Sequence, residues 1–178
     1  RTMEKYPASV AQFSRGGVPY EAGDVLKQSD LAATLTRIAE RGPAGFYEGE
    51  TALLIEKDMT AHGGPITRAD LKAYRPERRV PVRGTYRGYD VISMPPISSG
   101  GTALIQMLNM LEGYDLAANG FGSAKNVHLI VEAMRRAYAD RARYLGDSAF
   151  NPQMPIARLT SKEYAAELRK TIRLDRAS

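Results

Sequence analysis

The sequence has 178 residues, of which 43% are hydrophobic and 25% charged, a balance typical of a globular chain and not of a disordered one. Lysine and arginine outnumber the acidic residues by 25 to 20, and this net charge of +5 permits an acidic partner without identifying one. The absence of cysteine excludes a disulfide framework, a thiolate nucleophile and a cysteine-ligated zinc site, and no apolar run approaches the roughly 20 residues of a membrane span.

The first stretch, residues 1–23, is predicted to be mainly loop, because its scattered apolar residues are interrupted by residues that break helices and strands. The breakers are Pro7, Gly16, Gly17, Pro19 and Gly23. The chain shows no signal-peptide pattern and begins at Arg1 without an initiator methionine. We therefore expect it to be a segment of a longer protein.

Three helices are predicted in the next part of the chain, residues 25–75. The first is capped by Ser29 or Asp30 and ends at Gly42. The second covers residues 49–61 and stops at a Gly-Gly-Pro run. The third covers residues 69–74, after the capping-box spacing of Thr67 and Asp70. We expect these helices to form a peripheral subregion.

The hydrophobic period changes after Arg79. Residues 80–86 and 89–94 are rich in β-branched and aromatic side chains and are separated by Arg87 and Gly88, which predicts a β-hairpin. Pro81 places its strand at an edge, because proline has no N–H to donate to a ladder. Residues 102–111 are apolar on nearly every side, which predicts a buried helix.

A long helix is predicted from about Ser123, and a last one over residues 161–174. The long helix carries an apolar stripe of Val127, Ile130, Val131, Met134, Ala137, Tyr138, Ala142 and Leu145. Glu132, Arg136 and Asp140 lie away from that stripe, whereas Arg141 projects into it and needs a partner. We take Asp140 and Arg141 as candidates for a structural ion pair; the alternatives are a fork onto helix-end carbonyls or an arginine that binds an anion in a cleft.

The turn Ser98–Ser99–Gly100–Gly101 is a candidate anion site, because hydroxyls and free N–H groups gather before a helix. Its alternative interpretation is capping at a tight strand-to-helix turn. The only two histidines, His62 and His128, stand far apart in the sequence, and we expect no metal or other cofactor. The arginines are interleaved with acids and lack stacking aromatics, so we expect no nucleic-acid partner.

Several strings together resemble the γ-glutamyltranspeptidase family, in particular the C-terminal part of its large subunit. They include LAATL at 31–35, GFYEG at 45–49, GGPIT at 63–67, MPPISSGG at 94–101, AYADR at 137–141 and LGD at 145–147. Shorter matches lie at residues 38–39, 70–71, 74, 79–82, 86–89, 108–112, 128 and 132–134. They follow the family's order over about residues 25–172. Ile97 departs from the family, which usually has a third proline there.

The resemblance implies an α/β (α+β) fold: part of the αββα sandwich of an N-terminal nucleophile hydrolase, mostly helical here with a β-hairpin. Residues 1–178 would be one segment of a larger domain, with 25–75 as the peripheral helical subregion and 79–178 as the hairpin and buried helices of the sandwich. It also implies a precursor that cleaves itself into two subunits, and a periplasmic or extracellular location.

The implied activity is γ-glutamyl transfer from donors such as glutathione to water or an amine. The nucleophile is the N-terminal threonine of the small subunit, so no catalytic residue of the family maps onto this chain and the small subunit is its implied partner. The alternatives are a related acylase for cephalosporin or glutaryl amides, and a non-catalytic interaction domain.

Overall fold

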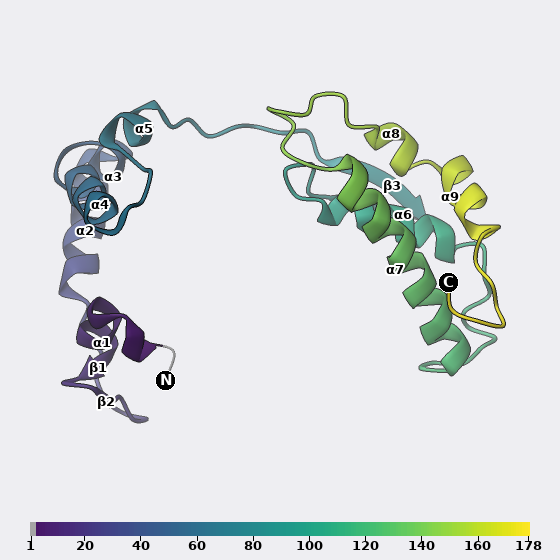
Figure 1. The fold of residues 1–178 in the computed structure, drawn as a ribbon, viewed down its shortest axis with the longest axis horizontal. Coiled ribbons are helices and arrows are strands. Elements are labelled where there is room, and N and C mark those ends of the chain that lie inside the picture. Colours follow the sequence, from purple (N-terminus) through teal and green to yellow (C-terminus); the bar gives the residue numbers. More distant parts are fainter. Residues whose placement is uncertain (1–2) are drawn as a thin grey trace. The chain divides into compact units, whose positions relative to one another are not determined.

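The computed structural model describes residues 3–178. The chain divides into two compact units, Arg1–Glu77 and Arg78–Ser178 (Figure 1). The described residues are mostly helical, with two small antiparallel hairpins, which agrees with an α+β fold. Among them no helix is both long enough and apolar enough to cross a bilayer.

The N-terminal stretch is more regular than predicted, and the expectation of a loop is wrong for residues 3–19, while residues 1–2 lie outside the described part of the chain. It contains the 3-10 helix η1 (Met3–Lys5), α1 (Pro7–Phe13) and a hairpin of β1 (Ser14–Arg15) and β2 (Val18–Pro19). Pro7 stands at the first position of α1, where its missing N–H costs no hydrogen bond. Gly16 and Gly17 have positive φ angles and form the hairpin turn.

The three helices predicted in the N-terminal unit are confirmed as α2 (Ser29–Arg41), α4 (Gly49–His62) and α5 (Arg68–Ala73). Neither Ser29 nor Asp30 is the cap of α2, since the helix already begins at Ser29 and Gln28 precedes it. The capping box of α5 is confirmed: the Asp70 N–H donates to Thr67 Oγ1 at 3.2 Å, and the Thr67 N–H donates to Asp70 Oδ2 at 2.9 Å.

The short helix α3 (Ala44–Tyr47) was not predicted. It packs closely on α2, because a Cβ on Gly45 would lie 2.1 Å from the carbonyl oxygen of Arg37. Thr51 of α4 is buried at this junction, where its hydroxyl donates to the Gly45 carbonyl and accepts from Arg37 Nε. A four-residue helix is too short to leave a periodic pattern in the sequence.

The C-terminal unit opens with the predicted hairpin, β3 (Val82–Tyr86) and β4 (Tyr89–Ser93). The turn residues Arg87 and Gly88 both have positive φ, which is the geometry of a type I′ turn. Helix α6 (Gly100–Leu111) contacts both strands and the helices α7 (Ala124–Tyr144), α8 (Ile156–Leu159) and α9 (Lys162–Arg169). The buried helix is thus confirmed, whereas α8 was not predicted and α9 ends earlier than expected.

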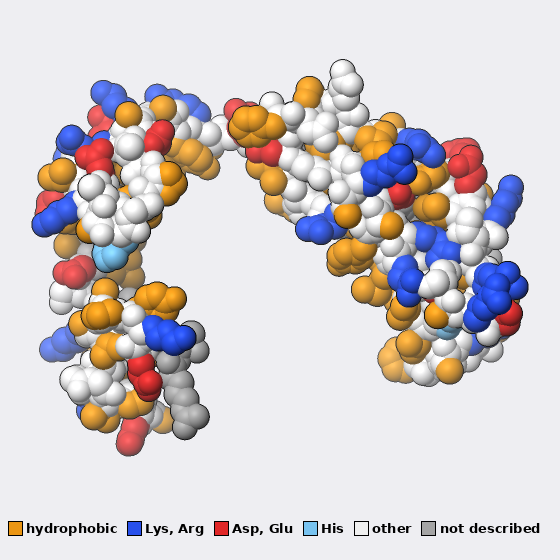
Figure 2. Space-filling view, viewed as in Figure 1, with side chains coloured by type: hydrophobic (Ala, Val, Ile, Leu, Met, Phe, Trp, Pro, Cys, Tyr) orange, Lys and Arg blue, Asp and Glu red, His pale blue; other side chains and the backbone are white. Residues whose placement is uncertain are grey.

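Helix α7 buries a different face from the one predicted. Its buried apolar residues are Leu129, Ala133 and Ala137, which pack in the core with Met110 of α6. Most of the predicted stripe is exposed, including Val131 and Met134, and Figure 2 shows apolar side chains along the edge of the unit where α7 runs. Small alanines allow α7 to lie close to α6, so the helix is turned by about 100°, one residue, from the prediction.

Candidate functional site

The two candidate anion-binding features of the sequence meet in the C-terminal unit. Ser99 is the N-cap of α6, and its hydroxyl accepts a hydrogen bond from Arg141 Nε of α7 at 2.8 Å. Ser98 Oγ accepts a longer bond of 3.3 Å from the Gly100 N–H. Arg141 is exposed and not buried in an apolar stripe as predicted, because that side of α7 faces outward. Its charge therefore needs no buried partner.

Gly101, at the start of α6, allows the helix to pack closely against the hairpin. A Cβ at Gly101 would lie 2.2 Å from the Met94 carbonyl oxygen and 2.7 Å from a methyl group of Val82. Gly100, in contrast, faces open space apart from Ser98. The second glycine is thus required by the contact of α6 with the hairpin, which supports a tight strand-to-helix turn, whereas the Ser99 side chain makes no capping hydrogen bond to α6.

A pocket of about 240 Å³ lies between the turn and the end of α7. Its lining comprises Ile97, Ser99, Arg141, Ala142, Leu145, Gly146 and Asp147. Asp147 Oδ1 accepts from the Ala149 N–H at 2.9 Å and lies 3.9 Å from Arg79. The pocket lining therefore carries one guanidinium, that of Arg141, and one carboxylate, that of Asp147, which also faces Arg79 outside the lining.

Asp140 and Arg141, the candidates for a structural ion pair, form hydrogen bonds to uncharged side chains: Arg141 to Ser99, and Asp140 to Gln106 and Tyr164. Adjacent residues of a helix point in directions about 100° apart. Asp140 therefore faces α6 and α9, whereas Arg141 does not. The Asp140 carboxylate accepts from Gln106 Nε2 at 2.6 Å and from the Tyr164 hydroxyl at 3.2 Å. Gln106 is 1% exposed, so Asp140 satisfies a buried amide of α6. Burial and the Asp140 carboxylate raise the pKa of Tyr164.

Glu132 is the polar residue whose environment the sequence did not reveal. It is 1% exposed and lies 2.7 Å from the Arg136 guanidinium. Its carboxylate also accepts hydrogen bonds from the Ser178 N–H, at 3.0 Å, and from the Ser178 hydroxyl. The hydrogen bonds from Ser178, together with Arg136, lower the pKa of Glu132 to about 2. The spacing of Glu132 and Arg136 is that of a helical ion pair, but no local signal indicates the contact with Ser178.

Both histidines contact groups of the protein itself. His128 Nε2 lies 2.6 Å from the carbonyl oxygen of Arg173, and because a carbonyl only accepts, this nitrogen donates. His62 is exposed at the end of α4, with Nδ1 3.3 Å from Asp58. In the part of the chain that the structure describes, no three acidic, histidine or cysteine residues gather to hold a metal.

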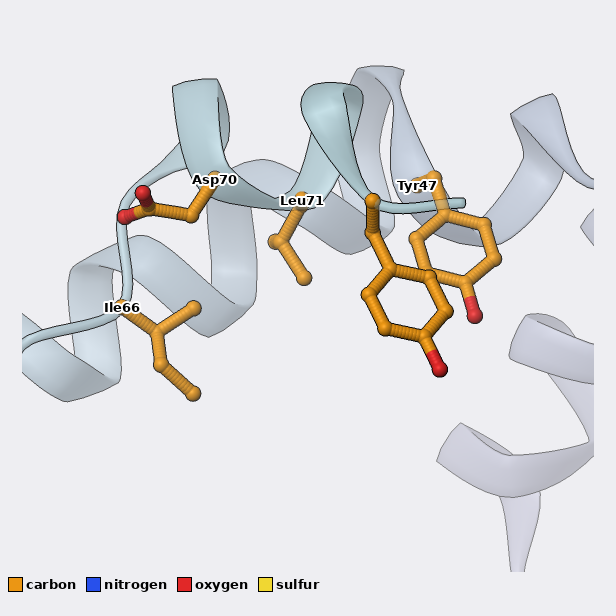
Figure 3. A pocket seen from close by; sticks show the side chains of 5 residues that line it. Tyr47, Ile66, Asp70 and Leu71 are labelled. Atoms are coloured by element: carbon orange, nitrogen blue, oxygen red, sulfur yellow. The ribbon is translucent and has the colours of Figure 1, made fainter. Parts of the chain in front are cut away.

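A second pocket lies in the N-terminal unit and is mainly apolar (Figure 3). Its lining comprises Tyr47, Ile66, Asp70, Leu71 and Tyr74, with the two tyrosine rings stacked at 5.4 Å between centroids. Figure 3 shows the Asp70 side chain turned toward the chain that leads into α5 and away from the Tyr47 ring. Because Thr67 already occupies the Asp70 carboxylate, the pocket offers no free charged group.

A hydroxyl nucleophile is commonly activated by a neighbouring base. Between residues 3 and 178, no serine or threonine hydroxyl is hydrogen-bonded to a histidine, the arrangement that activates a hydroxyl nucleophile. Of the buried polar residues of α6 and α7, Gln106, Asn126 and Glu132 are hydrogen-bonded within the protein, whereas Thr102 Oγ1 and Asn109 Oδ1 have no partner among the described residues.

Comparisons with known proteins agree along the whole chain. A sequence model described as gamma-glutamyltranspeptidase matches residues 1–178. The chain is 48% identical to the acylase ACY 1 proenzyme of Pseudomonas sp. (strain V22) and 46% identical to the glutathione hydrolase proenzyme of Escherichia coli (strain K12), in both cases over 98% of its length. It spans only 31% and 30% of those relatives. The crystal structure of Helicobacter pylori gamma-glutamyltranspeptidase superimposes with a TM-score of 0.94 at 48% identity, over 99% of this chain and 50% of that one.

Proposed function

This chain belongs to the gamma-glutamyltranspeptidase family, and we propose that it is the scaffold part of an enzyme that cleaves γ-glutamyl amides such as glutathione. The observation that supports this function is the agreement of sequence and fold with that family from one end of the chain to the other. The nucleophile would be the N-terminal threonine of a small subunit formed from the same precursor, and no catalytic residue would lie in residues 1–178.

The proposed reaction is an acyl transfer. The α-amino group of the threonine takes up the proton of its own hydroxyl, whose oxygen attacks the γ-glutamyl carbonyl. Backbone N–H groups stabilise the oxyanion. The amine leaves with a proton, and water or an acceptor amine then takes the γ-glutamyl group and frees the threonine.

In this proposal the C-terminal unit is part of an αββα sandwich. The exposed apolar face of α7, with Val131 and Met134, supports this packing, because such a face needs a cover in a folded protein. The sheet that covers it would come from the remaining parts of the enzyme. Residues 79–178 would then supply the hairpin and buried helices, and residues 25–75 a peripheral helical subregion.

A related acylase is the second candidate, because one of the similar relatives is named acylase ACY 1. The two functions differ in the acyl group, since a γ-glutamyl group carries an α-amino group that a glutaryl group lacks. A site that hydrogen-bonds and charge-pairs that amino group rejects the analogue without it.

The test is to express the full-length precursor and compare its rates on a γ-glutamyl anilide and a glutaryl anilide. We expect splitting into two subunits and faster release of aniline from the γ-glutamyl substrate. Faster release from the glutaryl substrate would favour the acylase. A precursor that neither splits nor cleaves either substrate would overturn both and leave an interaction domain.

A further inference from the structure

One side of α7 holds the segment that follows α9. Three polar side chains stand four residues apart on the helix, at His128, Glu132 and Arg136. This spacing places them in a row along one face. The segment they contact, residues 171–178, has left the helical conformation, because α9 ends at Arg169.

The contacts reach the main chain of this segment at both ends. Near its start, Arg136 Nη2 donates to the carbonyl oxygen of Thr171 at 2.7 Å, and His128 donates to that of Arg173 at 2.6 Å. At Ser178, the N–H donates to Glu132 Oε1 at 3.0 Å. Arg136 and Glu132 also bond the hydroxyls of Thr171 and Ser178, so the main chain and side chains of the segment are held together at both ends.

Two residues of this row, Glu132 and Arg136, are largely buried. The side chains of Glu132 and Arg136 are 1% and 11% exposed, and Ile172 of the segment is buried in the core cluster that includes Leu129 and Ala133 of α7. A buried ion pair adds little stability over apolar residues of the same size, whereas it demands one geometry. The arrangement therefore fits a function that depends on where the segment lies.

We propose that Glu132 and Arg136 are positioning residues for the self-cleavage of the precursor, which rests on the proposed function. By fixing residues 171–178, they direct the following chain, with its future N-terminal threonine, to the place where cleavage occurs. In that step the peptide bond before the threonine breaks and one water molecule is added across it. The products are a carboxylate on the large subunit and a free α-amino group on the threonine. The positioning residues exchange no atoms.

The test follows the splitting of the full-length precursor into subunits on gels, expressed per folded precursor. Glu132→Gln keeps the shape but replaces one acceptor oxygen with an NH2 group that opposes either Arg136 or the Ser178 N–H. We expect it to slow splitting about tenfold or more, since small displacements of a reacting group have large effects on rate. Once splitting is complete, kcat and KM should equal those of the wild-type enzyme.

The matched control is Glu112→Gln. Glu112 also accepts a main-chain N–H, that of Arg87 at 2.6 Å, and pairs with Lys162, but it does not contact residues 171–178. It should split at the wild-type rate per folded molecule. Equal slowing in both variants would indicate a general loss of stability and overturn the proposal, as would wild-type splitting of Glu132→Gln.

If Glu132→Gln does not fold, a second pair of variants, at the exposed Ser178, tests the proposal. Ser178→Pro removes the N–H and hydroxyl that reach Glu132, whereas Ser178→Ala keeps the N–H. Slower splitting of the proline variant than of the alanine variant supports the proposal, and equal rates overturn it. A wild-type precursor that never splits would defeat the proposed function itself, whereas splitting that none of these variants alters would defeat only the positioning role.

Discussion

Arg141 of α7 donates a hydrogen bond from Nε to the hydroxyl of Ser99, and so ties the end of the long helix to the turn before α6. The two residues are 42 positions apart in the sequence. Each belonged to a separate candidate anion site, and the structure joins them across one pocket. Part of the guanidinium's hydrogen-bonding capacity is thereby used by the protein itself.

The first prediction concerns this hydrogen bond. Because Arg141 is exposed, a double-mutant cycle of Arg141→Ala and Ser99→Ala should give a coupling of about 0.5–1 kcal/mol in the free energy of unfolding. Urea unfolding of the two single variants and the double variant measures it. A coupling near zero would show that the contact contributes nothing, whereas a value several times larger would contradict the exposed position of Arg141.

The second prediction separates the two glycines of the turn. Gly101→Ala should destabilise the protein by about 2–4 kcal/mol, because the new methyl group would overlap the Met94 carbonyl and Val82. Gly100→Ala is the control, with open space around it and a helical backbone, and should be neutral or stabilising by up to about 1 kcal/mol. Urea unfolding compares them. Equal effects would mean that the close approach of α6 to the hairpin is absent.

The sequence predicted those elements whose local signals are strong. Arg87 and Gly88 marked the hairpin turn, and Thr67 with Asp70 marked the start of α5, because a two-residue turn and a capping box depend on adjacent residues. The start of α1 and the first hairpin were missed because Pro7 and the Gly16–Gly17 pair were interpreted as breakers. In the structure Pro7 begins a helix, and the two glycines connect two strands.

The orientation of α7 was not predictable from apolar periodicity alone. The larger apolar residues, such as Val131 and Met134, lie on its exposed face, while Ala133 and Ala137 face α6. Periodicity identifies an apolar face but not its partner, and a helix that meets two partners has two such faces. The environment of Glu132 depends on that orientation and on residues 171–178, so no local signal identifies it.

The third prediction tests the hydrogen bonds of Asp140. Asp140→Ala removes the acceptor for the buried Gln106 amide and for the Tyr164 hydroxyl. We expect a loss of about 2–3 kcal/mol in the free energy of unfolding, the effect of leaving a buried donor without a partner. Asp147→Ala, at the partly exposed edge of the pocket, should change it by less than about 1 kcal/mol. Equal losses in urea unfolding would contradict the structural role assigned to Asp140.

The fourth prediction concerns the exposed apolar face of α7. The chain produced alone should self-associate, because Val127, Val131, Met134 and Tyr138 are each 40–52% exposed along one helix. Val131→Lys combined with Met134→Lys should shift it toward the monomer in light scattering. Ala139→Lys is the control, because Ala139 is exposed on the same helix but lies outside this apolar face, and it should leave association unchanged. A monomeric wild-type chain would show that this face needs no cover.

The fifth prediction concerns stability in acid. The pKa of Glu132 in the folded protein is about 2, below its ordinary value of 4.5, so the ionised carboxylate stabilises the folded state. That contribution is fully present above pH 4.5 and is lost as the pH falls toward 2. Lys162 and the Arg87 N–H lower the pKa of Glu112 as well, so part of the acid sensitivity belongs to that residue.

Urea unfolding at several pH values measures how much of the acid sensitivity comes from Glu132 and how much from other residues such as Glu112. Glu132→Gln should be less stable than the wild type at pH 7, and its stability should fall less steeply between pH 4.5 and 2. The difference in slope should be at most about 1.4 kcal/mol per pH unit, the value for one proton. If Glu132→Gln keeps the wild-type slope, the carboxylate is not held in its ionised form by Ser178 and Arg136, and the anchoring of residues 171–178 to α7 loses its electrostatic basis.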